Sequence, residues 1–182
     1  MSKTKILVQL HDKTFSHFLT EFEIDTIVQE LADRINKDYN GKQPLLLGVL
    51  NGSFMFISDL MKKLTIDCEL SFIKLASYSG TESQGEVNEL IGLSTTLDNK
   101  DVIVLEDIID TGNTVGKIFE LLKDEKTKSL AIGTLLLKPD VFKDQFKVDY
   151  VGQEIPDAFV VGYGLDYDQL GRNLKEIYQL SN

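Results

Sequence analysis

Three carboxylates and a short polar loop lie close together near the middle of this 182-residue chain. Glu106 and Asp107 follow an apolar run at 102–105, Asp110 comes three residues after Asp107, and Thr111-Gly112-Asn113-Thr114 completes the loop. Backbone N–H groups of such a loop bind phosphate, whereas carboxylates suit hydroxyl groups or a divalent metal ion. The combination indicates a site for a ligand that carries a phosphate at one end and hydroxyl groups or a metal nearby.

The residues on either side of the loop predict the elements that hold it. Residues 102–105 are apolar, mostly β-branched and preceded by a polar turn, as in a buried strand. From Val115 onward, apolar residues recur with helical spacing. A strand, a loop and a helix in this order direct the loop amides and the helix N-terminus at one spot.

A purely structural interpretation of these residues is also available. Glu106 and Asp107 could end an exposed strand, and Asp110 could cap the next helix. A lone Asp-Thr-Gly would favour that interpretation, but the complete run of residues 102–115 favours a binding site.

Helices and strands alternate along the rest of the chain. The predicted helices are 22–39, a second from residue 54 and a third from 115, and the predicted strands are 45–50, 68–75, 102–105, 130–137, one near 150 and 158–161. This alternation predicts an α/β fold with a central, mostly parallel sheet flanked by helices. The segment 76–93, rich in Gly, Ser and Thr, interrupts the pattern and is either a plain insertion or a mobile lid.

The composition limits the classes of function. The formal charge of −10 argues against a nucleic-acid binder and would repel a polyphosphate, so phosphate binding should depend on amides, a few cations and Mg²⁺. The single cysteine excludes an internal disulfide framework, and no apolar stretch has the length of a membrane span. We therefore expect a cytoplasmic protein that has neither a membrane nor a nucleic acid as partner.

Further candidate residues lie at the ends of other strands, where ligands of parallel sheets bind. Asn51 and Gly52 follow strand 45–50, and Lys138 follows strand 130–137. The tail then supplies an aromatic residue, Phe159, and a carboxylate, Asp166, before Arg172. Each signal is weak alone, because a strand-end lysine is commonly solvated and a phenylalanine is commonly part of the core.

Taken together, these segments resemble a known enzyme family. The run 102–115 resembles the phosphoribosyl diphosphate (PRPP) motif of the type I phosphoribosyltransferases. The turn at 50–53, the Ser-Tyr pair at 77–78, Lys138 and the tail 160–167 add a similarity to the hypoxanthine-guanine members that runs almost end to end. The resemblance implies one domain over 1–182, with a core at about 22–140, a lid at about 76–93, and a small base-binding hood formed by the N-terminal segment and about 148–182.

The resemblance also implies a reaction and roles for the residues. N9 of a 6-oxopurine, hypoxanthine or guanine, would attack C1 of PRPP and release diphosphate, with Asp110 as general base or acceptor at purine N7. Glu106 and Asp107 would hold the ribose hydroxyls and one Mg²⁺, and Asp166 would bind a second. The remaining assignments are PRPP binding by Asn51, Gly52, Asp110, Thr111, Gly112, Asn113, Thr114 and Arg172, base binding by Lys138, Phe159, Val160 and Asp166, and lid closure by Ser77 and Tyr78.

The sequence departs from the family pattern at Asn51 and Asn113, where many relatives carry lysine. Both differences remove positive charge near the phosphates of PRPP. Two other functions are considered, namely a PRPP-sensing regulatory protein on the same fold and a transferase that prefers xanthine or another base. The resemblance further implies a homodimer or homotetramer.

Overall fold

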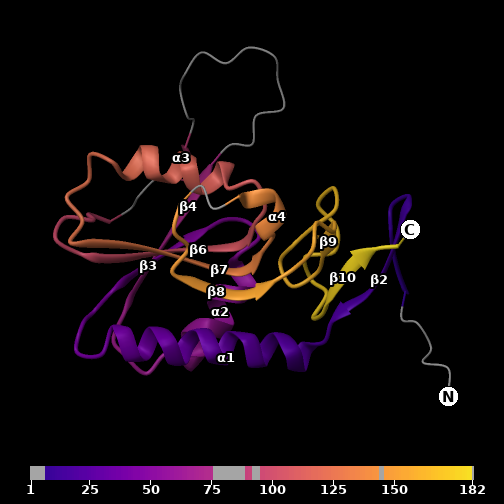
Figure 1. Cartoon of the computed structure of the whole chain (residues 1–182), viewed down its shortest axis with the longest axis horizontal. Coiled ribbons are helices and arrows are strands. Elements are labelled where there is room, and N and C mark those ends of the chain that lie inside the picture. Colours follow the sequence, from indigo (N-terminus) through magenta and orange to yellow (C-terminus); the bar gives the residue numbers. More distant parts are fainter. Residues whose placement is uncertain (1–6, 76–88, 92–94, 144–145, 182) are drawn as a thin grey trace, which may run out of the picture.

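The computed structural model describes residues 7–75, 89–91, 95–143 and 146–181, and its larger unit is a six-stranded sheet. The strand order is β5-β4-β3-β6-β7-β8 (Figure 1). All neighbours are parallel except β5, which pairs antiparallel with β4. The strands are β3 (Leu45–Val49), β4 (Glu69–Leu75), β5 (Glu89–Ile91), β6 (Asp101–Ile109), β7 (Ser129–Leu137) and β8 (Tyr150–Glu154).

Helices cover both faces of this sheet. Figure 1 shows α1 (Glu21–Asp38) and α2 (Phe54–Lys63) on one side and α3 (Asn113–Leu122) on the other. Leu46 of β3 packs in the cluster that contains α1 and α2, whereas its neighbours Leu45 and Leu47 pack with α3. Because both of its faces are buried, the central strand β3 is apolar throughout. The predicted α/β architecture is confirmed.

The start of α1 shows why the helix begins at Glu21. The Thr20 hydroxyl accepts a hydrogen bond from the Glu23 amide at 3.1 Å, and the Glu23 carboxylate accepts one from the Thr20 amide at 2.8 Å. This reciprocal capping box satisfies two amides that have no partner within a helix. The prediction of a helix at 22–39 was therefore correct to within one residue at each end.

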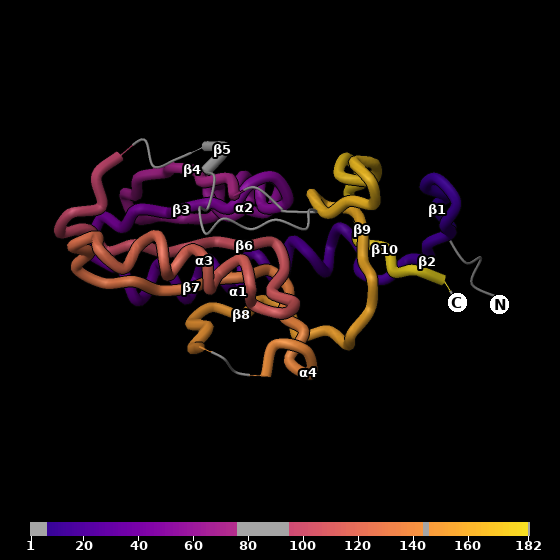
Figure 2. Tube along the Cα trace, turned by 90° about the horizontal axis from the view of Figure 1, so that it is seen from above, coloured from indigo at the N-terminus to yellow at the C-terminus, as the bar shows by residue number. Residues whose placement is uncertain are grey.

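A smaller, four-stranded sheet lies at one end of the larger one (Figure 2). Its order is β1-β2-β10-β9, and all three pairs are antiparallel. The strands are β1 (Leu7–Leu10), β2 (Lys13–Leu19), β9 (Val160–Val161) and β10 (Ile177–Leu180). The hood was predicted to begin near residue 148, but β8 pairs in parallel with β7, so this segment belongs to the larger sheet. The sequence boundary came too early because β8 is short and lacks a long apolar run.

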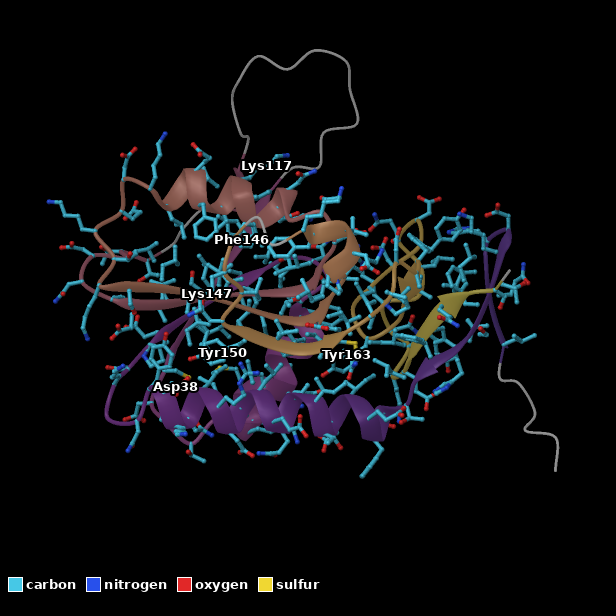
Figure 3. The ribbon with its side chains drawn as sticks, in the orientation of Figure 1. Asp38, Lys117, Phe146, Lys147, Tyr150 and Tyr163 are labelled. Atoms are coloured by element: carbon cyan, nitrogen blue, oxygen red, sulfur yellow. The ribbon has the colours of Figure 1, made fainter. Side chains whose placement is uncertain are left out.

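A buried tyrosine connects the two units. Tyr163, labelled in Figure 3, follows β9. Its hydroxyl donates a hydrogen bond to the Asp59 carboxylate of α2 at 2.7 Å. Burial and the adjacent carboxylate both raise the pKa of Tyr163, so the hydroxyl stays protonated and remains a donor.

A short helix, α4 (Pro139–Phe142), follows β7. No helix among the described residues is long and apolar enough to cross a membrane.

Tyr163→Phe should lower the free energy of unfolding by about 1–2 kcal/mol, because it removes a hydrogen bond to a charged group across the two units. Denaturant titration measures this change. Tyr178→Phe is the matched control, since the Tyr178 hydroxyl bonds to Glu176 only two residues away. An equal loss in both variants would show that the bond between the units has no special weight.

Candidate active site

Two adjoining cavities lie beyond the carboxyl ends of β3 and β6. The larger has a volume of about 540 Å³ and the smaller about 230 Å³. The predicted residues in the larger one are Asn51, Gly52, Glu106, Asp107, Asn113, Thr114, Asp166 and Arg172. The smaller is formed by residues 106–115 and so adds Asp110, Thr111 and Gly112. The structure thus brings residues from three distant segments to one place.

The polar loop between β6 and α3 has the form of an anion site. Gly112 has a φ of +79°, and a Cβ there would lie 2.9 Å from the ring of Phe142. Only glycine suits this conformation and this close approach. The N-cap residue of α3, Gly112, makes no side-chain cap, and the Asn113 amide donates a long hydrogen bond of 3.4 Å to the Thr111 hydroxyl. The amides that follow Asn113 in the first turn are therefore available to a ligand at the positive end of the helix dipole.

Glu106 and Asp107 are acids in a poorly solvated position. Burial, reinforced by the neighbouring Asp107, raises the pKa of Glu106 well above its usual range. Burial also raises the pKa of Asp107, to about 6. Hydrogen bonds from backbone amides, including that of Ile108 at 2.9 Å, and the positive charge of Arg172 act in the opposite direction but do not outweigh burial. Oε2 of Glu106 is buried and has no hydrogen-bond partner. Such a pair can accept bonds from hydroxyl groups or bind a cation, either of which would supply the missing partner.

The turn after β3 lies directly against Asp107. A Cβ on Gly52 would be 1.5 Å from Oδ2 of Asp107, and a Cβ on Gly164 would be 2.0 Å from the Gly52 carbonyl oxygen. The peptide between Leu50 and Asn51 is cis. The Gly52 backbone therefore lies between the motif strand and the C-terminal loop, with no space for a side chain on either glycine.

Asp166 and Arg172 form an ion pair at the opening of the larger cavity. The guanidinium lies 2.7 Å from Oδ1 of Asp166 and donates a second bond to the Gly164 carbonyl at 2.8 Å. The Gln169 amide donates to the other oxygen of Asp166 at 2.8 Å. The carboxylate and the guanidinium are thus both held near Asp107.

Lys138 lies between two carboxylates. Its ammonium is 2.9 Å from Asp110 and 3.0 Å from Asp157, and its side chain is only 7% exposed. Burial alone would lower the pKa of Lys138, but the hydrogen bonds to Asp110 and Asp157 outweigh burial and raise it. The lysine is therefore a fixed cation, and it joins the motif loop to the segment that leads into β9.

Phe159 directly precedes β9 of the smaller sheet and Val160 begins it, and neither residue lines the two cavities. Val160 is buried in β9, whereas Phe159 is 45% exposed. One side of the Phe159 ring packs against Tyr167, with the ring centroids 5.8 Å apart, and Lys13 lies 5.6 Å from its centroid. An exposed aromatic ring held from behind in this way can stack on a flat ligand.

Some residues of the site could not be found from sequence alone. Lys74 and Lys117 line the larger cavity, and Asp157 pairs with Lys138, yet each is a charged residue with no local motif. Gly164 is recognisable only through its contact with Gly52. Ser77 and Tyr78, with most of the predicted lid, lie outside the described residues, and 89–91 form β5.

Comparison with known proteins gives one consistent match. The model of the phosphoribosyl transferase domain matches residues 20–168. A hypoxanthine-guanine phosphoribosyltransferase of Staphylococcus aureus is 46% identical over 169 residues, which cover 92% of this chain and 94% of the relative.

Solved structures extend the match. The hypoxanthine-guanine phosphoribosyltransferase of Bacillus anthracis has a TM-score of 0.84 at 37% identity, and the alignment covers 91% of this chain and 98% of that one. The hypoxanthine phosphoribosyltransferase of Trypanosoma cruzi has a TM-score of 0.85 at 34% identity, with coverage of 96% and 95%.

Gly52→Ala should lower kcat/KM by about 100-fold or more, because the new methyl group, 1.5 Å from Asp107 Oδ2, must displace either the turn or the carboxylate by well over about 1 Å. Steady-state kinetics of the transferase reaction measure this. Gly116→Ala in α3 is the control, since a Cβ there meets nothing within 4 Å, and it should leave kcat/KM unchanged. Full activity in Gly52→Ala would contradict the proposed tight contact.

Proposed function

The chain belongs to the phosphoribosyltransferase family and has its type I fold, and from this premise we propose how it acts in purine salvage. It is a hypoxanthine-guanine phosphoribosyltransferase, a pentosyl transferase that moves the 5-phosphoribosyl group from PRPP to N9 of hypoxanthine or guanine. The products are IMP or GMP and diphosphate. The observation that supports this assignment best is the Lys138 ammonium, fixed beside Asp110 at the edge of the phosphate loop.

The PRPP half of the reaction uses the motif loop and the turn at Gly52. The free amides at the start of α3, with the loop residues 111–114, bind the 5′-phosphate. Glu106 and Asp107 accept hydrogen bonds from the ribose hydroxyls, which would give the buried Oε2 of Glu106 its partner. The amides of Asn51 and Gly52 and the guanidinium of Arg172 bind the diphosphate.

The carboxylates also fit Mg²⁺. This ion keeps several waters and binds through one or two carboxylates together with substrate phosphates. Asp107, with Glu106, would hold one ion at the ribose, and Asp166 would hold another at the diphosphate, because all three line the same cavity. When bound, Mg²⁺ neutralises the diphosphate and improves it as a leaving group.

The base half of the reaction uses the Lys138 cluster. Two of the three ammonium hydrogens are accounted for by Asp110 and Asp157, and we assign the third to O6 of the purine. Phe159 supplies a stacking face, and Val160, the next residue, begins β9. Adenine has an amino group at position 6, which is a hydrogen-bond donor like the ammonium. Adenine binding would therefore place two donors against each other and leave the buried cation of Lys138 incompletely paired.

Asp110 is the group that we assign to the chemical step. Its Oδ2 holds Lys138, so Oδ1 is the oxygen that would accept from N7 as N9 attacks C1 and the diphosphate leaves. The transition state resembles a ribosyl oxocarbenium ion, which the nearby carboxylates stabilise electrostatically. The reaction thus needs a proton acceptor and fixed negative charge in one place, and the site has both.

The same family basis supports the remaining proposals. We propose a homodimer or homotetramer, to be measured by analytical ultracentrifugation. The one cysteine, Cys68, is free, which accords with a reducing compartment and the proposed cytoplasmic location. A PRPP-sensing regulator would bind PRPP without releasing diphosphate, and a xanthine enzyme would turn over xanthine faster than hypoxanthine. One assay therefore distinguishes these two functions from the proposed hypoxanthine-guanine transferase.

That assay measures diphosphate release from PRPP with hypoxanthine, guanine, xanthine, adenine, uracil and orotate. Hypoxanthine and guanine should be used, and adenine should be rejected by about 10⁴-fold or more, the discrimination available to a site built around one polar contact. Lys138→Gln should reduce the difference in kcat/KM between the oxopurines and adenine by lowering kcat/KM for the oxopurines, because the glutamine amide can both donate and accept hydrogen bonds. Efficient use of adenine by the unchanged protein would refute the assignment of Lys138.

Asp110→Asn should lower kcat by about 10²–10⁴-fold, the usual contribution of a general acid–base group, with little change in the KM for PRPP. Asp157→Asn is the matched control, because it removes the other carboxylate that holds Lys138 and should change kcat far less. Equal losses in the two variants would mean that Asp110 acts only by positioning Lys138.

A further inference from the structure

The phosphate loop of this chain contains no lysine. Asn113 opens α3 within the loop, and Asn51 precedes Gly52 in the other phosphate-binding segment. Both side chains are neutral amides in a protein with a formal charge of −10. A phosphate with two negative charges therefore needs a cation from elsewhere in the fold.

Lys117 lies one helical turn after Asn113. It lies on α3 (Figure 3) and lines the larger cavity together with Asn113 and Thr114. Residues four apart share a face of a helix and are about 6 Å apart along its axis. Helical side chains lean toward the N-terminus, so the four-carbon stem of Lys117 can carry its ammonium back over Asn113.

The charge of Lys117 is also uncommitted. Arg172 is paired with Asp166, and Lys138 is paired with Asp110 and Asp157. Lys117, in contrast, is exposed and makes no ion pair within the described part of the chain. It can therefore turn toward a bound phosphate without breaking an existing interaction.

We infer that Lys117 binds the 5′-phosphate of PRPP and of the nucleotide product, in place of a lysine within the loop. The inference rests on the proposed function and adds a binding residue to it. The α3 amides hold the phosphate oxygens at the helix N-terminus, and Lys117 supplies the full positive charge beside them. This arrangement moves the cation from the loop to the helix but keeps it at the same phosphate.

The test is Lys117→Gln, which keeps the length and polarity of the side chain but removes its charge. The KM for PRPP and the Kd for IMP should each rise about tenfold, as for loss of one hydrogen bond to a charged group. The KM for hypoxanthine and the inhibition constant for diphosphate should not change, because neither ligand has a 5′-phosphate. Lys123→Gln, at the other end of α3, is the control and should change none of these constants.

A second variant tests the position of the charge. Asn113→Lys combined with Lys117→Gln should restore the KM for PRPP, since it returns a cation to the loop. Unchanged binding of PRPP and IMP in Lys117→Gln would overturn the inference. An equal loss of affinity for diphosphate would also overturn it, because it would show that Lys117 attracts all phosphates through its charge and does not contact the 5′-phosphate. The proposed function is tested separately by the transferase activity of the unchanged protein. If that activity were absent, the proposed function would be refuted whatever the result for Lys117→Gln.

Discussion

The site depends on a backbone contact at Gly52 that leaves no space for a side chain. The turn after β3, the Asp107 carboxylate at the end of β6 and the loop at Gly164 meet there. These segments lie far apart in the sequence, and two of them belong to the core whereas the third lies between β9 and β10 of the small sheet. A side chain on either glycine would separate them. The contact thus sets the distance between the turn after β3, the acids at the end of β6 and the Asp166–Arg172 pair, which are the groups that we propose to bind PRPP.

The charges around this contact divide into two groups. Lys138 and Arg172 each have carboxylate partners already and are held in place before any ligand arrives. Glu106 is instead buried and Asp107 half-buried, both have raised pKa values, and one oxygen of Glu106 is unpartnered. The first group provides a fixed geometry. The second group is destabilised by burial without partners, and hydrogen bonds from hydroxyl groups or contact with a metal ion would offset this cost on binding.

Much of this arrangement could be predicted from the sequence because its signals are local. Strands buried on both faces are continuously apolar, as at 45–49 and 102–105, and the motif residues are adjacent in the chain. The antiparallel pairing of β5 and the place of β8 in the larger sheet depend on contacts between distant segments. The pairing of Asp157 with Lys138 and the approach of Gly164 to Gly52 carry no local signal, so neither could be predicted.

The strand order of the small sheet has a consequence for synthesis on the ribosome. β10, which follows the other described strands in the sequence, lies between β2 and β9 and pairs with both. Until β10 emerges, β2 lacks a partner along one edge and β9 lacks its paired strand. The α/β core can condense earlier, because its strands are already present. The larger sheet can thus form while residues 177–180 are still being made, whereas the small sheet is complete only after they have emerged from the ribosome.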